Sequence, residues 1–328
     1  MFMTRQRILL LTRVVMAVSL TLGCAAASTY TFEPVVLCSG CGSLVSGINN
    51  AGAIAGSVYV STGAHAFYGR MDALTTFDQN GAVFTEAIGI TDSGRVTVNF
   101  FTPLGTGRAY ILETDGTKNF LPIVEGARYV LGGNMNESGV AVGFYSNSLD
   151  GTGGVRSFAT SGTTLDYTFA YPGALITQAL GINNAAVIVG QYLNSPDGLP
   201  HGFIRNTDGT LNPFDIPGSL STSVYDINNR GGIAGTYVDT SSRQHGFVYQ
   251  DGSFTSLDFT GPSTTIFGIN DLGQAVGASY PAGGLFTGPY SGFVATLVPE
   301  PSSAYFVLFA TVAVAVRRLR LFRRRAAN

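Results

Sequence analysis

The sequence has no tryptophan, three cysteines and three histidines, and charged residues make up only 12% of its 328 residues. Three cysteines are too few for a dense disulfide framework, and a formal net charge of -2 argues against nucleic acid as a partner. A hydrophobic content of 45% excludes a disordered chain. The 43 glycines, with many Val, Ile, Thr, Tyr and Phe residues, are typical of an all-β protein with many tight turns.

The N-terminus has the features of an export signal. An apolar stretch follows three basic residues, Arg5, Arg7 and Arg13. Small residues come next, and this order is typical of a secretory signal peptide. We expect residues 1–27 to be removed by cleavage between Ala27 and Ser28. Cys24 leaves a lipoprotein as an alternative, although Thr21 stands where the lipoprotein processing sequence has leucine.

The C-terminus carries a second signal. Pro299, Glu300 and Pro301 lead into the apolar segment 304–316. This segment is shorter than the roughly 20 residues that a membrane-spanning helix needs. A cluster of arginines follows it: Arg317, Arg318, Arg320, Arg323, Arg324 and Arg325. Such a cluster holds the end of the chain at the cytoplasmic face of a membrane.

In their order, these features resemble the PEP-CTERM sorting signal of Gram-negative bacteria, which the membrane protease exosortase reads. The resemblance covers residues 299–328. It implies passage through the general secretion machinery, transient anchoring in the inner membrane through 304–316, and cleavage by exosortase near Pro301. It also implies a final place at the cell surface or outside the cell, with exopolysaccharide as a candidate partner. A plain C-terminal membrane anchor is the alternative.

The region between the two signals is acidic. Nine of the 18 basic residues lie in the terminal segments, whereas all 20 acidic residues lie within residues 28–303, which therefore have a net charge near -11. This charge favours solubility and disfavours anionic polymers unless cations bridge them.

Residues 28–298 repeat one pattern six times. Its first part is Gly-Ile-Asn-Asn-x-Gly, which begins at Gly47 and recurs, with substitutions, every 42 to 47 residues. Its second part is His-Ala-Phe at 65–67, or a variant of it in the other five units. The two parts keep the same phase throughout. The pattern resembles the HAF repeat of bacterial extracellular proteins, a family that implies little about biochemical activity.

Each unit is predicted to hold four short strands separated by turns, because Asn-Asn and Asp-Gly are turn sequences. Four strands in about 45 residues are typical of one propeller blade, and a solenoid is disfavoured because its repeats are usually shorter or helical. We therefore expect an all-β, six-bladed β-propeller of four-stranded antiparallel blades, with helices only in the terminal signal and anchor segments. The sixth unit lacks a fourth strand, so we expect residues 29–34 to supply it and close the ring.

The repeated polar residues are interpreted as structural. The histidines share one slot of the repeat, and the first asparagines of the turns share another: His65, His201, His245, Asn49, Asn183, Asn228 and Asn270. This arrangement leaves no unique histidine as a catalytic base. Glu86 and Glu137 are acids outside the repeat, and neither has a partner visible in the sequence. Since these turns carry at most one carboxylate each, calcium is only an alternative there, and no other cofactor is expected.

Cys38 and Cys41 are the cysteines that remain after export, and we expect a local disulfide between them in an oxidising compartment. The interpretation of the whole is an exported, non-catalytic protein with a structural, adhesive or binding role at the cell surface or in the exopolysaccharide matrix. The alternative is a polysaccharide-active hydrolase or lyase, which needs two carboxylates at a set separation.

Overall fold

In a computed structural model of the chain, the described residues are 29–148, 154–194, 198–281 and 290–298, and they form strands and no helix. The all-β prediction is thereby confirmed for this part of the protein. No helix in these ranges is long and apolar enough to cross a membrane. The predicted signal peptide, the sorting motif, the segment 304–316 and the arginine cluster lie outside the described residues.

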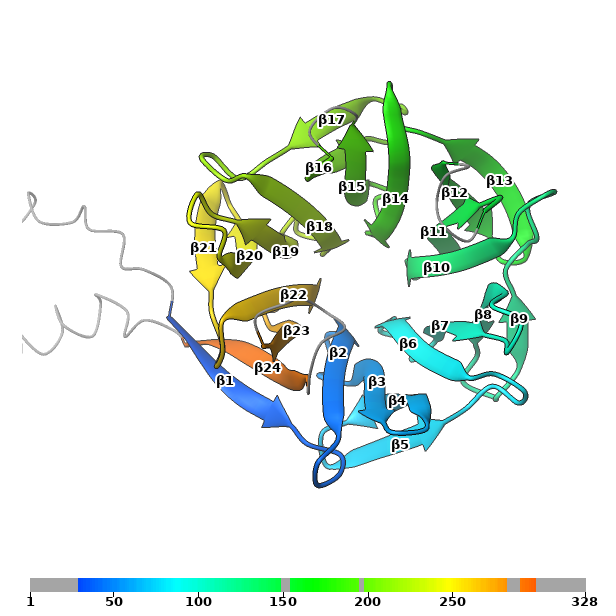
Figure 1. Cartoon of the computed structure of the whole chain (residues 1–328), viewed down its shortest axis with the longest axis horizontal. Coiled ribbons are helices and arrows are strands. Elements are labelled where there is room, and N and C mark those ends of the chain that lie inside the picture. The colour runs from blue at the N-terminus through cyan, green and yellow to red at the C-terminus, as the bar shows by residue number, and fades with distance from the viewer. Residues whose placement is uncertain (1–28, 149–153, 195–197, 282–289, 299–328) are drawn as a thin grey trace, which may run out of the picture. The chain divides into compact units, whose positions relative to one another are not determined.

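The strands of the unit Tyr30–Leu297 are arranged around a central axis, as Figure 1 shows. Six described strands stand closest to the axis: β2 (Gly42–Ile48), β6 (Phe84–Ile90), β10 (Tyr129–Met135), β14 (Ala174–Ile182), β18 (Ser221–Ile227) and β22 (Ser263–Ile269). Each pairs antiparallel with the strand that follows it: β3 (Ile54–Val60), β7 (Val96–Phe101), β11 (Val140–Ser146), β15 (Ile188–Asn194), β19 (Ile233–Val238) and β23 (Ala275–Tyr280).

The third strands carry the His-Ala-Phe part of the repeat. They are β4 (Gly63–Arg70), β8 (Gly107–Leu112), β12 (Val155–Ser161), β16 (Pro200–Arg205), β20 (Gln244–Gln250) and β24 (Ser291–Val298). The outermost strands are β5 (Ala73–Phe77), β9 (Lys118–Phe120), β13 (Thr164–Phe169), β17 (Leu211–Phe214), β21 (Ser253–Leu257) and, beside β24, the N-terminal β1 (Thr29–Val35). Sheets set radially about an axis in this way form a β-propeller.

The strand pairing differs from the predicted six separate sheets. In the described chain the strands form three eight-stranded sheets, each made of two antiparallel groups of four. One parallel residue pair joins the two groups of each sheet: Ala64 with Phe84, Val155 with Ile176, and Gln244 with Ser263. The physical reason is that the third strand of one group passes alongside the start of the next inner strand for a single residue pair.

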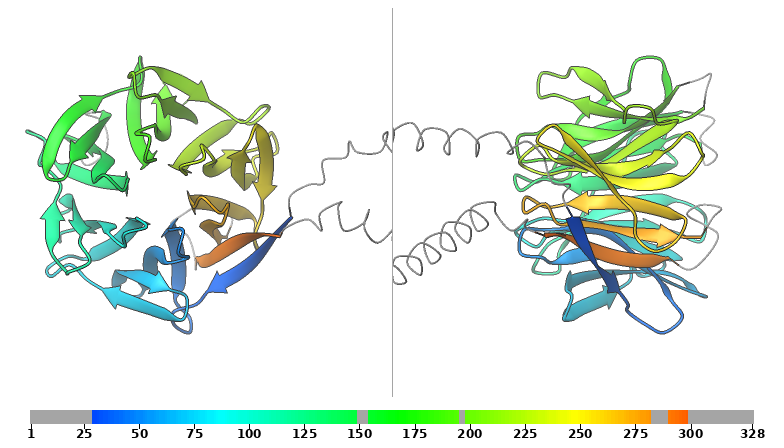
Figure 2. Two further views of the ribbon diagram at one scale, coloured as in Figure 1. Left: turned by 180° about the vertical axis from the view of Figure 1, so that it is seen from behind. Right: turned by 90° about the vertical axis from the view of Figure 1, so that its left-hand side faces the viewer.

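β1 lies beside β24, as predicted for residues 29–34 (Figures 1 and 2). The Thr31 hydroxyl donates a hydrogen bond to the Thr296 carbonyl at 3.4 Å. The ring of Phe32 lies 5.3 Å from the rings of both Phe259 and Phe293. The first described strand therefore covers the last one with side-chain packing as well as backbone pairing, and β24 has no open edge there.

The apolar core lies between successive sheet faces and is organised by the third strands. In each of the six groups one aromatic ring is fully buried: Phe67, Tyr110, Phe158, Phe203, Phe247 and Phe293. Each ring pairs across to the second strand, where five of the six partners are glycines, as in Gly56 with Phe67. A Cβ at Gly56 would lie 2.7 Å from the Phe67 ring. The repeat therefore has glycine at this position because the aromatic ring occupies the space of a side chain.

Candidate functional site

The turns that follow the inner strands are linked to one another by hydrogen bonds. The bonds involve the second residue of each turn, which is Asn50 in the first unit. Its backbone N–H donates to a side-chain oxygen of the equivalent residue in the next unit, and the same holds in every unit. The donor–acceptor pairs are Asn50 to Asp92, Asp92 to Glu137, Glu137 to Asn184, Asn184 to Asn229, Asn229 to Asp271, and Asp271 back to Asn50. The last pair joins the final unit to the first, so these six bonds form a closed ring.

The predicted structural asparagines form a second layer of the same turns. Asn228 is typical: its Oδ1 accepts from the backbone N–H groups of Arg230 and Gly232 at 3.0 and 2.7 Å, and its Nδ2 donates to the Asn270 carbonyl at 3.0 Å. Asn49, Asn183 and Asn270 make the equivalent bonds to their own turns and to the next unit. One asparagine thus shapes its own turn and holds the neighbouring one.

The acidic residues of these turns accept hydrogen bonds from the neighbouring turn of the ring. Glu137 accepts from the Asp92 N–H, and its carboxylate lies 3.8 Å from the Arg95 guanidinium. Within the described ranges, no group of three or more His, Cys, Asp and Glu residues is placed to hold a metal ion. The carboxylates of the turns are therefore used as acceptors for backbone N–H groups.

The predicted histidines each pair with an aspartate at the end of the following strand. His65 lies 2.9 Å from Asp78, His201 lies 3.0 Å from Asp215, and His245 lies 2.9 Å from Asp258. The same pairing thus recurs in these three units. His245 also faces Asp239 at 3.3 Å.

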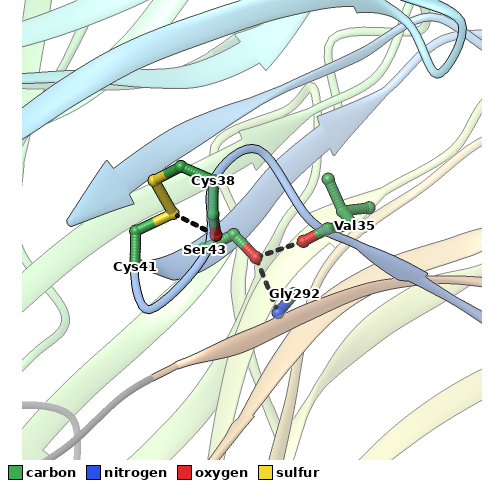
Figure 3. Close-up of a disulfide and its surroundings, with 5 residues drawn as sticks. All are labelled: Val35, Cys38, Cys41, Ser43 and Gly292. Atoms are coloured by element: carbon green, nitrogen blue, oxygen red, sulfur yellow. Dashed lines mark hydrogen bonds between the residues drawn. A yellow bond between two sulfur atoms is a disulfide. The ribbon is translucent and has the colours of Figure 1, made fainter. Parts of the chain in front are cut away.

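Cys38 and Cys41 are joined by a disulfide in the loop between β1 and β2. Figure 3 shows Ser43 beside it. The Ser43 hydroxyl donates to the Val35 carbonyl at 2.5 Å and accepts from the Gly292 N–H at 3.1 Å. One side chain thus ties β1, β2 and β24 together next to the disulfide loop, which strengthens the junction where the ring closes.

Two side chains that the sequence interpretation missed meet where the inner strands approach one another most closely. At the position of the repeat held by Gly47 in the first unit, the third and fifth units carry Asn134 and Asp226. Five of the inner strands have a bulge ending at this position, and β10 has one that spans it. The backbones are so close there that a Cβ at Gly47 would lie 2.8 Å from the Gly89 Cα. We call the pair Asn134 and Asp226 the throat.

The two throat side chains are joined by a hydrogen bond of 2.6 Å from Asn134 Nδ2 to Asp226 Oδ1. Asp226 also accepts from the backbone N–H groups of Ile227 and Ile269, both at 2.9 Å. Burial raises the pKa of the Asp226 carboxyl to about 7, and these three donors offset part of that effect. The signal for both residues was present in the sequence, because they are polar replacements of a repeated glycine.

A cavity of about 640 Å³ lies on one side of the throat. The inner strands of all six groups contribute to it, with help from second strands and from Tyr290. Its walls are mainly apolar and aromatic: Leu44, Tyr59, Phe84, Ile88, Phe101, Leu131, Phe144, Leu180, Tyr225, Phe267 and Tyr290. Its polar lining is Ser46, Ser57, Glu86, Asn99, Gly132 and Asn134. A cavity of this size and composition is typical of a site for a small molecule.

Glu86 is the one carboxylic acid among the described residues that line this cavity. The Tyr59 hydroxyl donates to its Oε1 at 2.9 Å. Burial raises the pKa of the Glu86 carboxyl, and the hydrogen bond from Tyr59 partly opposes that shift. Glu137 belongs to the ring of turns and not to this cavity. The two acids that the sequence singled out are therefore apart, and the described lining offers no second carboxyl of the kind that glycoside hydrolysis uses.

No family model and no curated protein matches the sequence. Among solved structures, the chain is similar to a streptogramin B lyase, with 11% identity, a TM-score of 0.44, and coverage of 82% of this chain and 98% of that one. It is also similar to TolB from Acinetobacter baumannii (11%, TM-score 0.46, coverage 76% and 68%) and to the six-bladed Aleuria aurantia lectin (12%, TM-score 0.44, coverage 84% and 97%). These values assign neither an activity nor a ligand.

Proposed function

We propose that this chain is an exported, non-catalytic propeller of six four-stranded blades that binds a small, largely apolar molecule in its central cavity. The observation that carries the proposal is the cavity of about 640 Å³, whose walls are mainly aromatic and aliphatic. The blade count is supported by the six turns that close into a hydrogen-bonded ring. The three eight-stranded sheets then each correspond to two blades touching at one residue pair.

The place of action is proposed from the sequence. The N-terminal signal, the PEP-CTERM-like tail and the HAF-like repeats favour export by a Gram-negative cell, processing by exosortase, and residence at the cell surface or in the exopolysaccharide matrix. The disulfide between Cys38 and Cys41 is in keeping with an oxidising compartment. A structural or adhesive contact with exopolysaccharide would use the outer loops and leaves the cavity free.

Binding without turnover is favoured over the hydrolase or lyase alternative by the single carboxyl in the described lining. A glycosidase places two carboxyl groups on either side of the scissile bond, whereas the described neighbours of Glu86 in the cavity are aromatic, aliphatic or uncharged polar groups.

The test is equilibrium binding of the neutral fluorescent probe N-phenyl-1-naphthylamine to the purified protein. We expect saturable binding to the wild-type protein and at least about tenfold weaker binding to Leu180→Trp, because the larger ring would fill the cavity. Leu175→Trp is the matched control, since Leu175 lies on the same strand, is 55% exposed and does not line the cavity. Equal binding by all three proteins would refute the proposal.

A further inference from the structure

Glu86 enters the cavity without a cationic partner. In the described chain, Lys, Arg and His are absent from the lining, and the described donor to Glu86 is Tyr59, which reaches Oε1. Oε2 has no hydrogen-bond donor among the described residues. An ionised carboxylate in an apolar cavity is costly unless a positive group pairs with it. A positively charged ligand group would therefore be stabilised beside Glu86 Oε2 on the wall of the cavity.

Aromatic rings lie near Glu86 on the cavity wall. Phe84 precedes Glu86 by two residues on β6 and so shares its face of the sheet. Phe101 is the cross-strand partner of Phe84. On the other side, the ring of Tyr290 lies 4.7 Å from the ring of Tyr59. Aromatic faces attract cations that have lost their water. The Glu86 carboxylate and these aromatic rings thus both favour a positively charged ligand group.

A metal ion does not suit this wall. Hard cations need several oxygen ligands, and no group of three or more metal-binding side chains occurs among the described residues. Asn99, the cross-strand neighbour of Glu86, already exchanges hydrogen bonds with the backbone of Gly132, at 2.8 and 2.9 Å. An ammonium group, by contrast, needs one carboxylate and aromatic faces, and its apolar body can fill the remaining volume.

From this arrangement we propose that the cavity takes a protonated organic amine with a compact apolar body, whose ammonium group pairs with Glu86 Oε2 and packs against the rings of Tyr59 and Phe84. The inference deepens the proposed function, since it depends on the cavity binding a small molecule. The negative charge of the region between the terminal signals also favours the approach of a cation.

The experiment compares 1-adamantylammonium with 1-adamantanol, which have the same apolar cage and differ in charge. Calorimetry at pH 8 is expected to give about tenfold tighter binding of the ammonium ion by the wild-type protein, the ratio that ~1.4 kcal/mol produces. In Glu86→Gln this preference disappears, while the new amide still accepts the Tyr59 hydrogen bond. Glu33→Gln is the matched control, because it makes the same charge change on an exposed residue of β1 and keeps the preference.

Lower pH gives an independent readout. The titratable described groups that face Glu86 are Tyr59 and Tyr290, and the pKa of each phenol is raised further above 10, so both stay neutral. Asp226 lies beyond Asn134, in the lining of the ring of turns. Burial raises the pKa of Glu86, and protonation removes its charge, so the preference for the ammonium ion falls as the pH is lowered from 8 in wild-type protein and stays flat in Glu86→Gln.

Three outcomes are decisive. Loss of the preference in Glu86→Gln, or its loss at low pH should that variant not fold, supports the proposal. Equal binding of alcohol and ammonium ion by wild-type protein overturns it and leaves the cavity function intact. If neither compound binds and N-phenyl-1-naphthylamine also fails to bind, both the further inference and the proposed function are wrong. Tyr59→Phe, which keeps the carboxylate, is expected to retain the preference.

Discussion

The burial of Asp226 in the throat predicts that the stability of the folded protein depends on pH. The pKa of Asp226 is raised from 3.8 to about 7 in the folded protein because the carboxyl is buried. Between these two values the folded state holds a proton that the unfolded state has lost. The stabilisation is therefore fully present below pH 3.8 and is lost as the pH rises through 7. Over that window the loss amounts to ~4 kcal/mol, at ~1.4 kcal/mol for each pKa unit.

Asp226→Asn removes this titration. The measurement is the free energy of unfolding in urea at several pH values from 4 to 8, for wild type and variant. We expect the difference between the two curves to shift by ~4 kcal/mol in favour of the variant as the pH rises. The exposed substitution Asp72→Asn controls for the change in net charge. Parallel curves for wild type and Asp226→Asn across this range would refute the raised pKa of Asp226 in the folded protein.

Three further substitutions test the ring and its closure. Phe32→Ala should lower the free energy of unfolding by ~2 kcal/mol and the melting temperature, measured by circular dichroism, by ~4–8 °C. The exposed substitution Glu33→Ala should change both little. Equal melting temperatures of the two variants would contradict closure of the ring by β1. Asn228→Ala should lower the free energy of unfolding in urea by ~2–3 kcal/mol, because buried N–H groups lose their acceptor. The exposed substitution Asn212→Ala should leave this free energy nearly unchanged. Equal values for the two variants would show that the ring of turns does not stabilise the fold. Cys41→Ser should cost ~2 kcal/mol or less, because the loop that the disulfide closes is short, and a larger loss in the same assay would show that the loop has a greater role.

The repeat carried most of the fold information. The two parts of the repeat, with the turn sequences Asn-Asn and Asp-Gly, predicted four short strands in each unit, and the described strands follow that order. The missing fourth strand of the last unit correctly indicated that residues 29–34 lie beside β24. These features depend on local pattern and on the number of strands, and both can be read from a sequence.

The candidate site was less accessible to such reasoning. Glu86 was noticed because it falls outside the repeat, but its partner Tyr59 lies 27 residues earlier on a strand of the preceding group. Asn134 and Asp226 are 92 residues apart and meet because the ring brings their strands to one axis. The bonds between successive turns also depend on closure of the whole ring. Contacts of this kind follow from the assembled geometry, which no single unit of the sequence contains.

Photolabelling is the sharpest test of whether the cavity inside the ring binds a small apolar molecule. The neutral probe 3-trifluoromethyl-3-phenyldiazirine is bound to the purified protein, activated by light and located by peptide mapping. We expect saturable labelling of inner strands such as β6 and β22, suppressed by excess N-phenyl-1-naphthylamine. Labelling that does not saturate and falls on exposed apolar residues such as Leu104 and Ile123 would contradict it.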